Sequence, residues 1–156
     1  MKTEPETFSI SDLERVRIEP WTGVRNYVAR NHMRAMSVGD DVLFYHSSCD
    51  PPGVAGLARV SRTGVVDETQ FDPESPYFDP RSKRDKPLWD CVEVEYVATL
   101  PHLVSLARLR REKSLRAMVL FTWSRLSVQP VTRRQFDKIV ELAQTPEPVV
   151  KKRVRS

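Results

Sequence analysis

The sequence has few of the residues that build metal sites, disulfides and phosphate-binding loops. Its 156 residues include two cysteines, three histidines and five glycines. Cys49, Cys91 and the histidines do not have the spacing of metal ligands, and the glycines form neither a P-loop nor a dinucleotide-binding motif. We therefore expect no metal and no cofactor, and we interpret both cysteines as reduced thiols.

Long apolar runs are also missing. No stretch approaches the roughly 18 residues that a membrane-spanning helix needs. The first six residues, MKTEPE, lack the apolar region of a secretory signal. We expect a soluble, intracellular protein without membrane contact, with the cytoplasm as its default location.

The body of the chain has no net charge of either sign. The protein has 25 basic and 21 acidic residues, and four of the basic ones lie among the last six residues, at 151, 152, 153 and 155. Residues 1–150 are therefore formally neutral, which argues against a groove that holds phosphates by net charge alone. Prolines at 146 and 148 precede the basic end, so we predict one domain over 1–143 and a flexible basic tail over 144–156.

Hydrophobic patterning predicts several strands. Residues 41–46 form an apolar, aromatic-rich run, and 54–66 form a second strand that contains glycines. Residues 89–97 alternate between apolar and acidic side chains, as a half-exposed strand does. A shorter strand is expected at 126–130. The strands do not alternate regularly with helices, so the pattern favours an α+β fold, a small mixed β-barrel with surrounding helices.

Helices and one long loop complete the predicted fold. Capping boxes predict helices that start at Ser11 and Thr132, and Ser105 is expected to cap a helix that ends at Arg111. A further helix is expected over 25–36. Residues 67–88 contain four prolines and no core pattern, so they are predicted to form a long loop, which in a compact domain is often functional.

Side chains suited to binding a base are concentrated in the segment WTGVRNY, residues 21–27. Trp21 offers a face for stacking, while Arg25 and Asn26 offer donors and acceptors for the edge of a base. The alternative is that Trp21 fills the core below the turn and that Arg25 faces solvent.

A second group of polar residues follows a predicted buried strand. Tyr45, His46 and Ser47 lie where this strand meets a loop, a place where barrels often bind ligands. A structural role for His46 is the alternative. His46 and Cys49 resemble a thiol-activating pair, but no third residue is placed to orient them.

A third group lies in the segment RLSVQPV, residues 125–131. Strand alternation puts Arg125, Ser127 and Gln129 on one side, which faces either solvent or a pocket. Trp123, just before them, serves either packing or stacking.

These segments resemble the EVE domain family along almost the whole predicted domain. The matching stretches are KTEP (2–5), WTGVRNYVARN (21–31), GD (39–40), FYHSSC (44–49), PGVAG (52–56), FDP (71–73), SPYFDP (75–80) and RLSVQPV (125–131). The sequence departs from the usual family pattern at Thr22, Val28 and Trp123, where an acidic residue, Gln, and Arg or Gln are common.

The resemblance implies a PUA-like barrel, related to YTH domains, that reads a modified base in DNA or RNA and has no enzymatic activity. We expect a monomer whose partner is nucleic acid, DNA or RNA, with a modified base. Carried over residue by residue, the base pocket would consist of Trp21, Arg25, Asn26, Tyr45, His46, Ser47, Ser127 and Gln129. Contacts to the nucleic-acid backbone are expected from Lys2, Arg30, Arg125, Lys151, Lys152 and Arg153.

Two other functions compete with base reading. A nucleotide-processing enzyme could use His46 with a carboxylate as acid and base. A protein-interaction module could use the loop around Tyr77 and Phe78.

Overall fold

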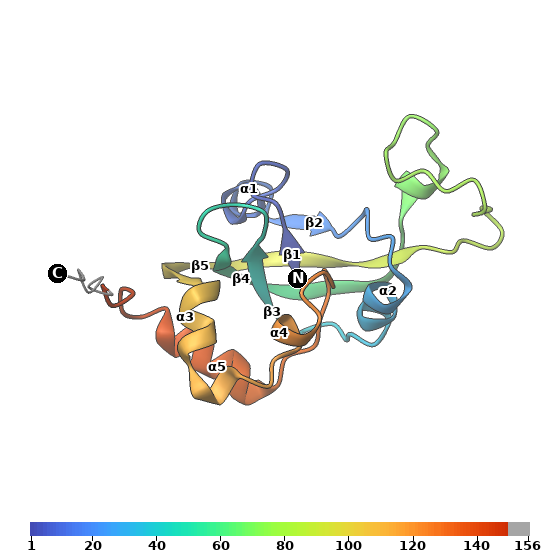
Figure 1. The fold of residues 1–156 in the computed structure, drawn as a ribbon. Helices are drawn as coiled ribbons and strands as arrows, with labels where there is room; N and C mark the ends of the chain where they lie inside the picture. The colour runs from blue at the N-terminus through green and yellow to red at the C-terminus, as the bar shows by residue number, and fades with distance from the viewer. Residues whose placement is uncertain (150–156) are drawn as a thin grey trace.

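The fold is organised around one five-stranded mixed sheet (Figure 1). The computed structural model describes residues 1–149, and the strands follow the order β1-β3-β4-β5-β2. β1 runs parallel to β3, and all other pairs are antiparallel. The strands are β1 (Lys2–Thr3), β2 (Ile18–Pro20), β3 (Asp41–His46), β4 (Gly53–Val66) and β5 (Asp90–Ser105).

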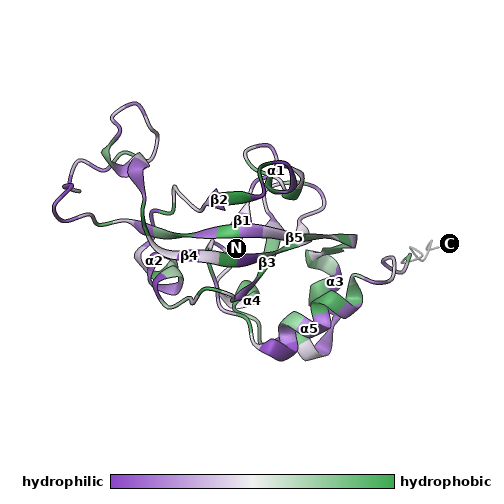
Figure 2. Ribbon diagram, turned by 180° about the vertical axis from the view of Figure 1, so that it is seen from behind, coloured by the Kyte–Doolittle hydropathy of each residue, from purple (hydrophilic) through white to green (hydrophobic). Residues whose placement is uncertain are grey.

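Within residues 1–149, five α-helices and two 3₁₀ helices surround the sheet. Figure 1 places α3 and α5 near one end of the sheet, and α2 and the loop that follows β4 near the other. The ribbons of α3 and α5 alternate between hydrophobic and hydrophilic colour, as amphipathic helices do (Figure 2). The elements are α1 (Ile10–Val16), α2 (Tyr27–Arg34), α3 (Leu106–Arg111), α4 (Val119–Thr122), α5 (Arg133–Leu142), η1 (Glu68–Phe71) and η2 (Lys113–Leu115).

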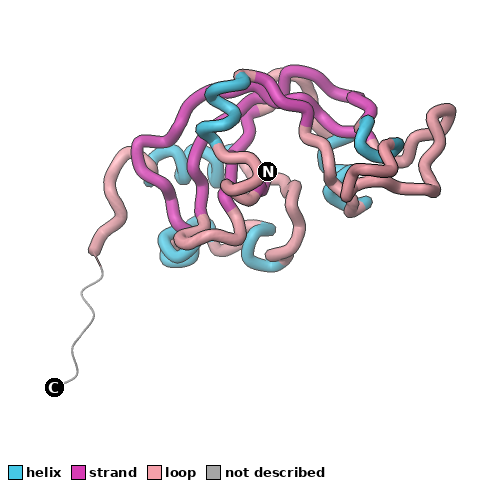
Figure 3. Tube along the Cα trace, turned by 90° about the horizontal axis from the view of Figure 1, so that it is seen from above, coloured by secondary structure: helices cyan, strands magenta, loops and turns pink. Residues whose placement is uncertain are grey.

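The sheet is open, which corrects part of the fold prediction. The α+β class is confirmed, but the predicted PUA-like barrel is not, because the sheet curves into an arch without closing (Figure 3). The two edge strands, β1 and β2, have two and three residues and do not pair with each other. Strands this short have too few backbone N–H and C=O groups to form the row of hydrogen bonds that would close the sheet into a barrel.

Two hydrophobic clusters fix the ends of the sheet. The first surrounds Phe44 and includes Leu13, Met33 and Leu126. The second includes Val104 and Ile139 and lies under α3 and α5. β4 and β5 contribute to both clusters, and their pairing contains several register shifts, which bend a sheet in this way.

Helix capping explains where the helices begin. Thr132 and Gln135 form the predicted capping box of α5, and Ser105 caps α3 as predicted. The capping box predicted at Ser11 is wrong by two residues, because Ser9 caps α1. The Ser9 hydroxyl accepts the Asp12 N–H, and the Asp12 carboxylate accepts the Ser9 N–H.

Strand predictions hold for the long strands and fail for short ones. Residues 41–46 and the second predicted strand match β3 and β4, while β5 continues eight residues beyond the predicted end at 97. Residues 126–130 form no strand. They lie beside β1 instead, through a bond from the Lys2 N–H to the Ser127 carbonyl (2.8 Å).

The segment after residue 143 is attached to the domain as far as it is described. Arg108 donates to the Thr145 carbonyl (2.8 Å), and Glu147 accepts from Ser105 and Arg111. The predicted phosphate contacts at 151–153 lie outside the described residues. No helix within residues 1–149 has the length and apolar character to cross a membrane.

Candidate functional site

A cleft of about 860 Å³ lies between the two edges of the open sheet. Lys2 and Thr3 of β1 line one wall, and Glu19, Pro20 and the adjoining Trp21 line the other. The volume falls within the range of about 300–1,000 Å³ that is typical of ligand sites. The gap that keeps the sheet from closing is therefore large enough to hold a ligand.

Trp21 is mostly a core residue that also reaches the cleft. Its side chain packs edge-on against Phe44 and Phe8, with ring centres 5.6 and 6.4 Å apart, and its backbone N–H donates to Val92 (2.8 Å). Only 7% of the residue is exposed, yet it lines the cleft. Trp21 thus fills the core, as the alternative interpretation held, and presents only a narrow strip of surface to a ligand.

Tyr77 is the more exposed aromatic residue of the cleft, and sequence analysis did not include it in the pocket. It comes from the long loop after β4 and is 40% exposed. Its ring lies so close to Gly23 that a Cβ on Gly23 would be 2.9 Å from the ring. Gly23 also has a positive φ of 86°, so this position favours glycine on two grounds.

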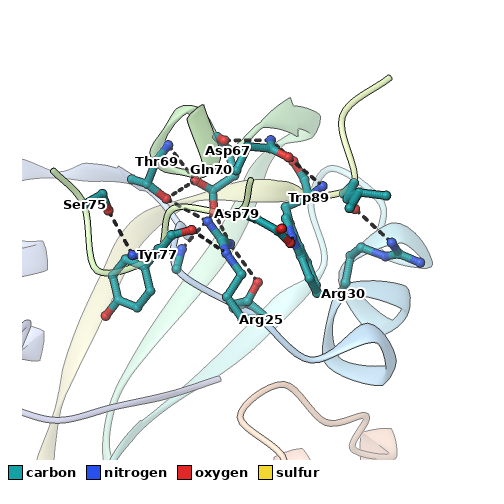
Figure 4. A network of polar contacts seen from close by, with 12 residues as sticks. Arg25, Arg30, Asp67, Thr69, Gln70, Ser75, Tyr77, Asp79 and Trp89 are labelled. Atoms are coloured by element: carbon teal, nitrogen blue, oxygen red, sulfur yellow. Dashed lines mark hydrogen bonds and ion pairs between the residues drawn. The ribbon is translucent and has the colours of Figure 1, made fainter. Parts of the chain in front are cut away.

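Arg25 ties this loop to the segment that precedes α2 (Figure 4). It donates to the carbonyls of Tyr77 and Val24, to the Asp67 carboxylate and to the Thr69 hydroxyl, each at 2.9–3.0 Å. These bonds use four of the five N–H donors of the guanidinium group. Arg25 lines the cleft, but most of its hydrogen-bonding capacity is used within the protein, one bond of it on Tyr77, and is not available for the edge of a base.

Asp67 is the buried centre of this network. One carboxylate oxygen accepts from Arg25 and from the Gly23 N–H, each at 2.9 Å, and the other accepts from the N–H and hydroxyl of Thr69. Desolvation by burial raises the pKa of Asp67, but hydrogen bonds from Arg25, Thr69 and Gly23 outweigh it, so the pKa lies below its ordinary value. Asp67 therefore remains ionised at neutral pH.

A second layer of buried polar contacts supports the loop. Gln70 donates to the carbonyls of Asp67 (2.7 Å) and Trp89 (2.6 Å), and the Trp89 indole donates to Asp79 (2.9 Å). Arg30 donates to the Leu88 carbonyl (2.8 Å). The predicted phosphate contact Arg30 thus anchors the end of the loop, and it does not line the cleft.

Three residues predicted for the base pocket do not line the cleft. His46 accepts the Ile10 N–H at Nε2 (3.1 Å), and Asn26 accepts the N–H groups of Val28 and Ala29 as the cap of α2. Gln129 donates to the carbonyls of Trp123 and Leu126. Each polar side chain satisfies a nearby backbone group, which explains its presence without a ligand.

The remaining predicted pocket residues do line the cleft. These are Tyr45, Ser47 and Ser127. Lys2 and Arg125, predicted to contact the nucleic-acid backbone, line it too, and so does Arg110 of α3, which the sequence analysis missed. Against these basic residues stand two acidic ones, Glu4 and Glu19, so the cleft is more basic than the neutral body.

Within residues 1–149, no three histidine, cysteine or acidic side chains cluster in a way that could hold a metal ion. Burial raises the pKa of the Cys91 thiol to about 12, so this cysteine is a protonated core residue.

The curved sheet and the cleft between its edges define a small α+β domain with a cleft of ligand size. The chain belongs to the EVE domain family, whose model matches residues 1–142. Human thymocyte nuclear protein 1 is 41% identical, covering 91% of this chain and 72% of that protein. The uncharacterized protein C21.03c of Schizosaccharomyces pombe is 34% identical, covering 95% of this chain and 66% of that protein.

Solved structures share the fold. A hypothetical protein from Leishmania major superposes with a TM-score of 0.90 at 49% identity, covering 92% of both chains. The human THYN1 protein in complex with 5-methylcytosine-containing DNA also has a TM-score of 0.90, at 41% identity, covering 95% of this chain and 97% of that one.

Proposed function

We propose that this protein is a non-catalytic domain that binds DNA by taking one modified nucleobase, such as 5-methylcytosine, into the cleft between β1 and β2. The cleft carries this proposal, because it combines aromatic surface from Trp21 and Tyr77 with basic residues at its rim. The similar human protein in complex with 5-methylcytosine-containing DNA supports the same partner.

The position of His46 weighs against the competing enzymatic function. Its Nε2 accepts a backbone N–H, and burial lowers the pKa of the imidazole, so that nitrogen is not available as a general base in the cleft. The cleft-lining residues include neither histidine nor cysteine. A binding role therefore agrees better with the described residues.

For a duplex, the free-energy cost of extracting a base and the gain from binding it in the cleft nearly cancel. Extracting a base costs a few kcal/mol, and stacking it on an aromatic side chain returns about 1–3 kcal/mol. Burying one methyl group adds about 0.8 kcal/mol. One stacking surface is thus barely sufficient for a duplex, and bases that are already exposed should bind more readily.

We expect 5-methylcytosine to bind about fourfold more tightly than cytosine in the same sequence, since about 0.8 kcal/mol from the buried methyl group corresponds to that ratio. Fluorescence anisotropy with two single-stranded oligonucleotides that differ only in this base would measure it. The same sequence as RNA tests the choice of sugar, and nucleoside analysis afterwards tests turnover. Equal affinity for both bases, or any loss of the modified base, would contradict the proposal.

Replacing Arg110 by Ala should weaken binding with little dependence on base identity. If Arg110 contacts one phosphate, its removal reduces the slope of log affinity against log salt by about 0.7 for a single strand. Arg15, an exposed residue of α1 that does not line the cleft, provides the matched control. Titrations at several salt concentrations should show the reduced slope for Arg110→Ala alone, and an unchanged slope would exclude this phosphate contact.

A further inference from the structure

Trp123 is an exposed indole beside the cleft. It is 47% exposed, whereas Trp21 and Trp89 are 7% and 3% exposed. It follows α4 directly, and the next two residues, Ser124 and Arg125, both line the cleft. A large aromatic side chain is therefore presented to solvent at the rim where nucleic acid would enter.

The backbone that carries this indole is held firmly. The Trp123 N–H donates to Val119 (2.8 Å), and its carbonyl accepts from the Gln129 side chain (3.1 Å). The Lys2 ammonium group donates to the Ser124 carbonyl (2.5 Å). Gln129 and Lys2, which sequence analysis assigned to ligand contacts, thus position this loop. A fixed loop loses little conformational freedom when it binds a partner.

An aromatic side chain and a guanidinium group at the mouth of a base-binding cleft suit one partner, a duplex from which one base has been extruded. Extrusion leaves a gap in the stack, and an inserted apolar or aromatic side chain can occupy it. Arg125, two residues after Trp123, is exposed and long enough to reach the phosphates that flank the gap. Resting on the proposed function, we propose that Trp123 inserts into the duplex beside the extruded base while Arg125 contacts the adjacent backbone.

This role would change the balance between single and double strands. In the cleft only Tyr77 has a well-exposed aromatic face, since Trp21 is 7% exposed, and stacking on one face only about offsets the cost of opening a base pair. Trp123 supplies a second surface, and this one acts only where a stacked duplex remains on either side of the gap. Its contribution is therefore specific to duplex DNA.

The test compares two probes, a duplex with one central 5-methylcytosine and its modified strand alone. Trp123→Ala should bind the duplex about 5- to 150-fold more weakly, the range that the loss of one stacking contact gives. On the single strand it should stay within about twofold of wild type, because no gap has to be filled there. Trp123→Phe should retain most duplex affinity. Val38→Ala, an exposed apolar residue that does not line the cleft, should match wild type on both probes.

The outcomes separate this inference from the proposed function. If wild type binds both probes and Trp123→Ala does so equally well, the proposed function survives and the inserted indole is excluded. An equal loss on both probes would place Trp123 against the bound base itself and also overturn the inference. A variant without a cooperative thermal transition would show that the indole is structural, with the same consequence. If the wild-type protein bound neither probe, both the proposed function and this inference would be excluded.

Discussion

Replacing Trp21 by Ala should lower the free energy of unfolding by about 3–5 kcal/mol, the usual cost of truncating a buried tryptophan. The indole packs against Phe44 and Phe8 in the cluster that joins the sheet to α1 and α2, and little of its surface reaches the cleft. A domain of this size is stable by only about 5–15 kcal/mol, so the loss is a large fraction of the total. Urea denaturation followed by circular dichroism would measure it.

Trp123→Ala serves as the control for this experiment. The same side chain is removed, but from an exposed position, so we expect a change of at most about 0.5 kcal/mol. Trp21→Phe should fall between the two, because it keeps an aromatic ring in the cluster. Suppose instead that the free energy of unfolding of Trp21→Ala lay within about 1 kcal/mol of the wild-type value and that the variant no longer bound ligand. The indole would then act mainly on the ligand, and our assignment of Trp21 to the core would be wrong.

The parts of the fold that depend on local chemistry could be predicted from sequence. The capping boxes, the apolar run of β3 and the alternation in β5 each lie within a few residues. β1 and β2 could not be predicted, because they form only where β3 and β5 offer an edge. Whether the sheet closes also depends on the distance and orientation between β1 and β2, and no local sequence pattern indicates these.

The candidate site shows the same division. Trp21 and Arg25 were recognisable because aromatic and guanidinium groups fall together in one segment. Tyr77 and Asp67 were not, since they join the site through contacts with Gly23 and Arg25 that span more than 40 residues of chain. The available signals were the length of the loop after β4 and the stretch SPYFDP (75–80), which resembles the family but does not show what the loop contacts.

Polar residues near a suspected pocket were the least predictable. Asn26, His46 and Gln129 have side chains suited to a base edge, yet each is bonded to a backbone group. Sequence shows which donors and acceptors are present, but the choice between a ligand and a nearby N–H or carbonyl is made by the folded backbone. Gln129 therefore acts on the Trp123 loop, which borders the cleft, and His46 acts on the first residue of α1.

Replacing Arg25 by Met should have the second large effect, a loss of about 3 kcal/mol of stability. Removing one partner of a buried ion pair costs about 3–5 kcal/mol, and we take the lower end because the Arg25 side chain is 21% exposed, while Asp67 is 2% exposed. The substitution also removes the bond to the Tyr77 carbonyl, so the loop should loosen and ligand affinity should fall. Arg34→Met breaks an arginine–aspartate ion pair at the surface, where the side chains of Arg34 and Asp90 are 44% and 23% exposed. This control should change stability by at most about 1 kcal/mol.

The pH dependence of stability tests whether Asp67 is the group that Arg25 stabilises. In wild type the pKa of Asp67 is depressed, so its contribution is complete above the unfolded pKa of about 3.9 and is lost as the pH falls through the lower folded value. In Arg25→Met the desolvation that raises this pKa persists without its largest opposing bond. The folded pKa of Asp67 should therefore rise towards or above the unfolded value, so less stability is lost on acidification than in wild type. The difference in stability between wild type and Arg25→Met should thus be largest at pH 7 and shrink as the pH falls, and denaturation curves between pH 3 and 7 would show this. Adding Asp67→Asn to Arg25→Met removes the buried charge, so the double variant should be more stable than Arg25→Met at pH 7, and this gain should also shrink as the pH falls. A gain that stays the same from pH 7 to pH 3 would mean that the charge of Asp67 is not what Arg25 stabilises.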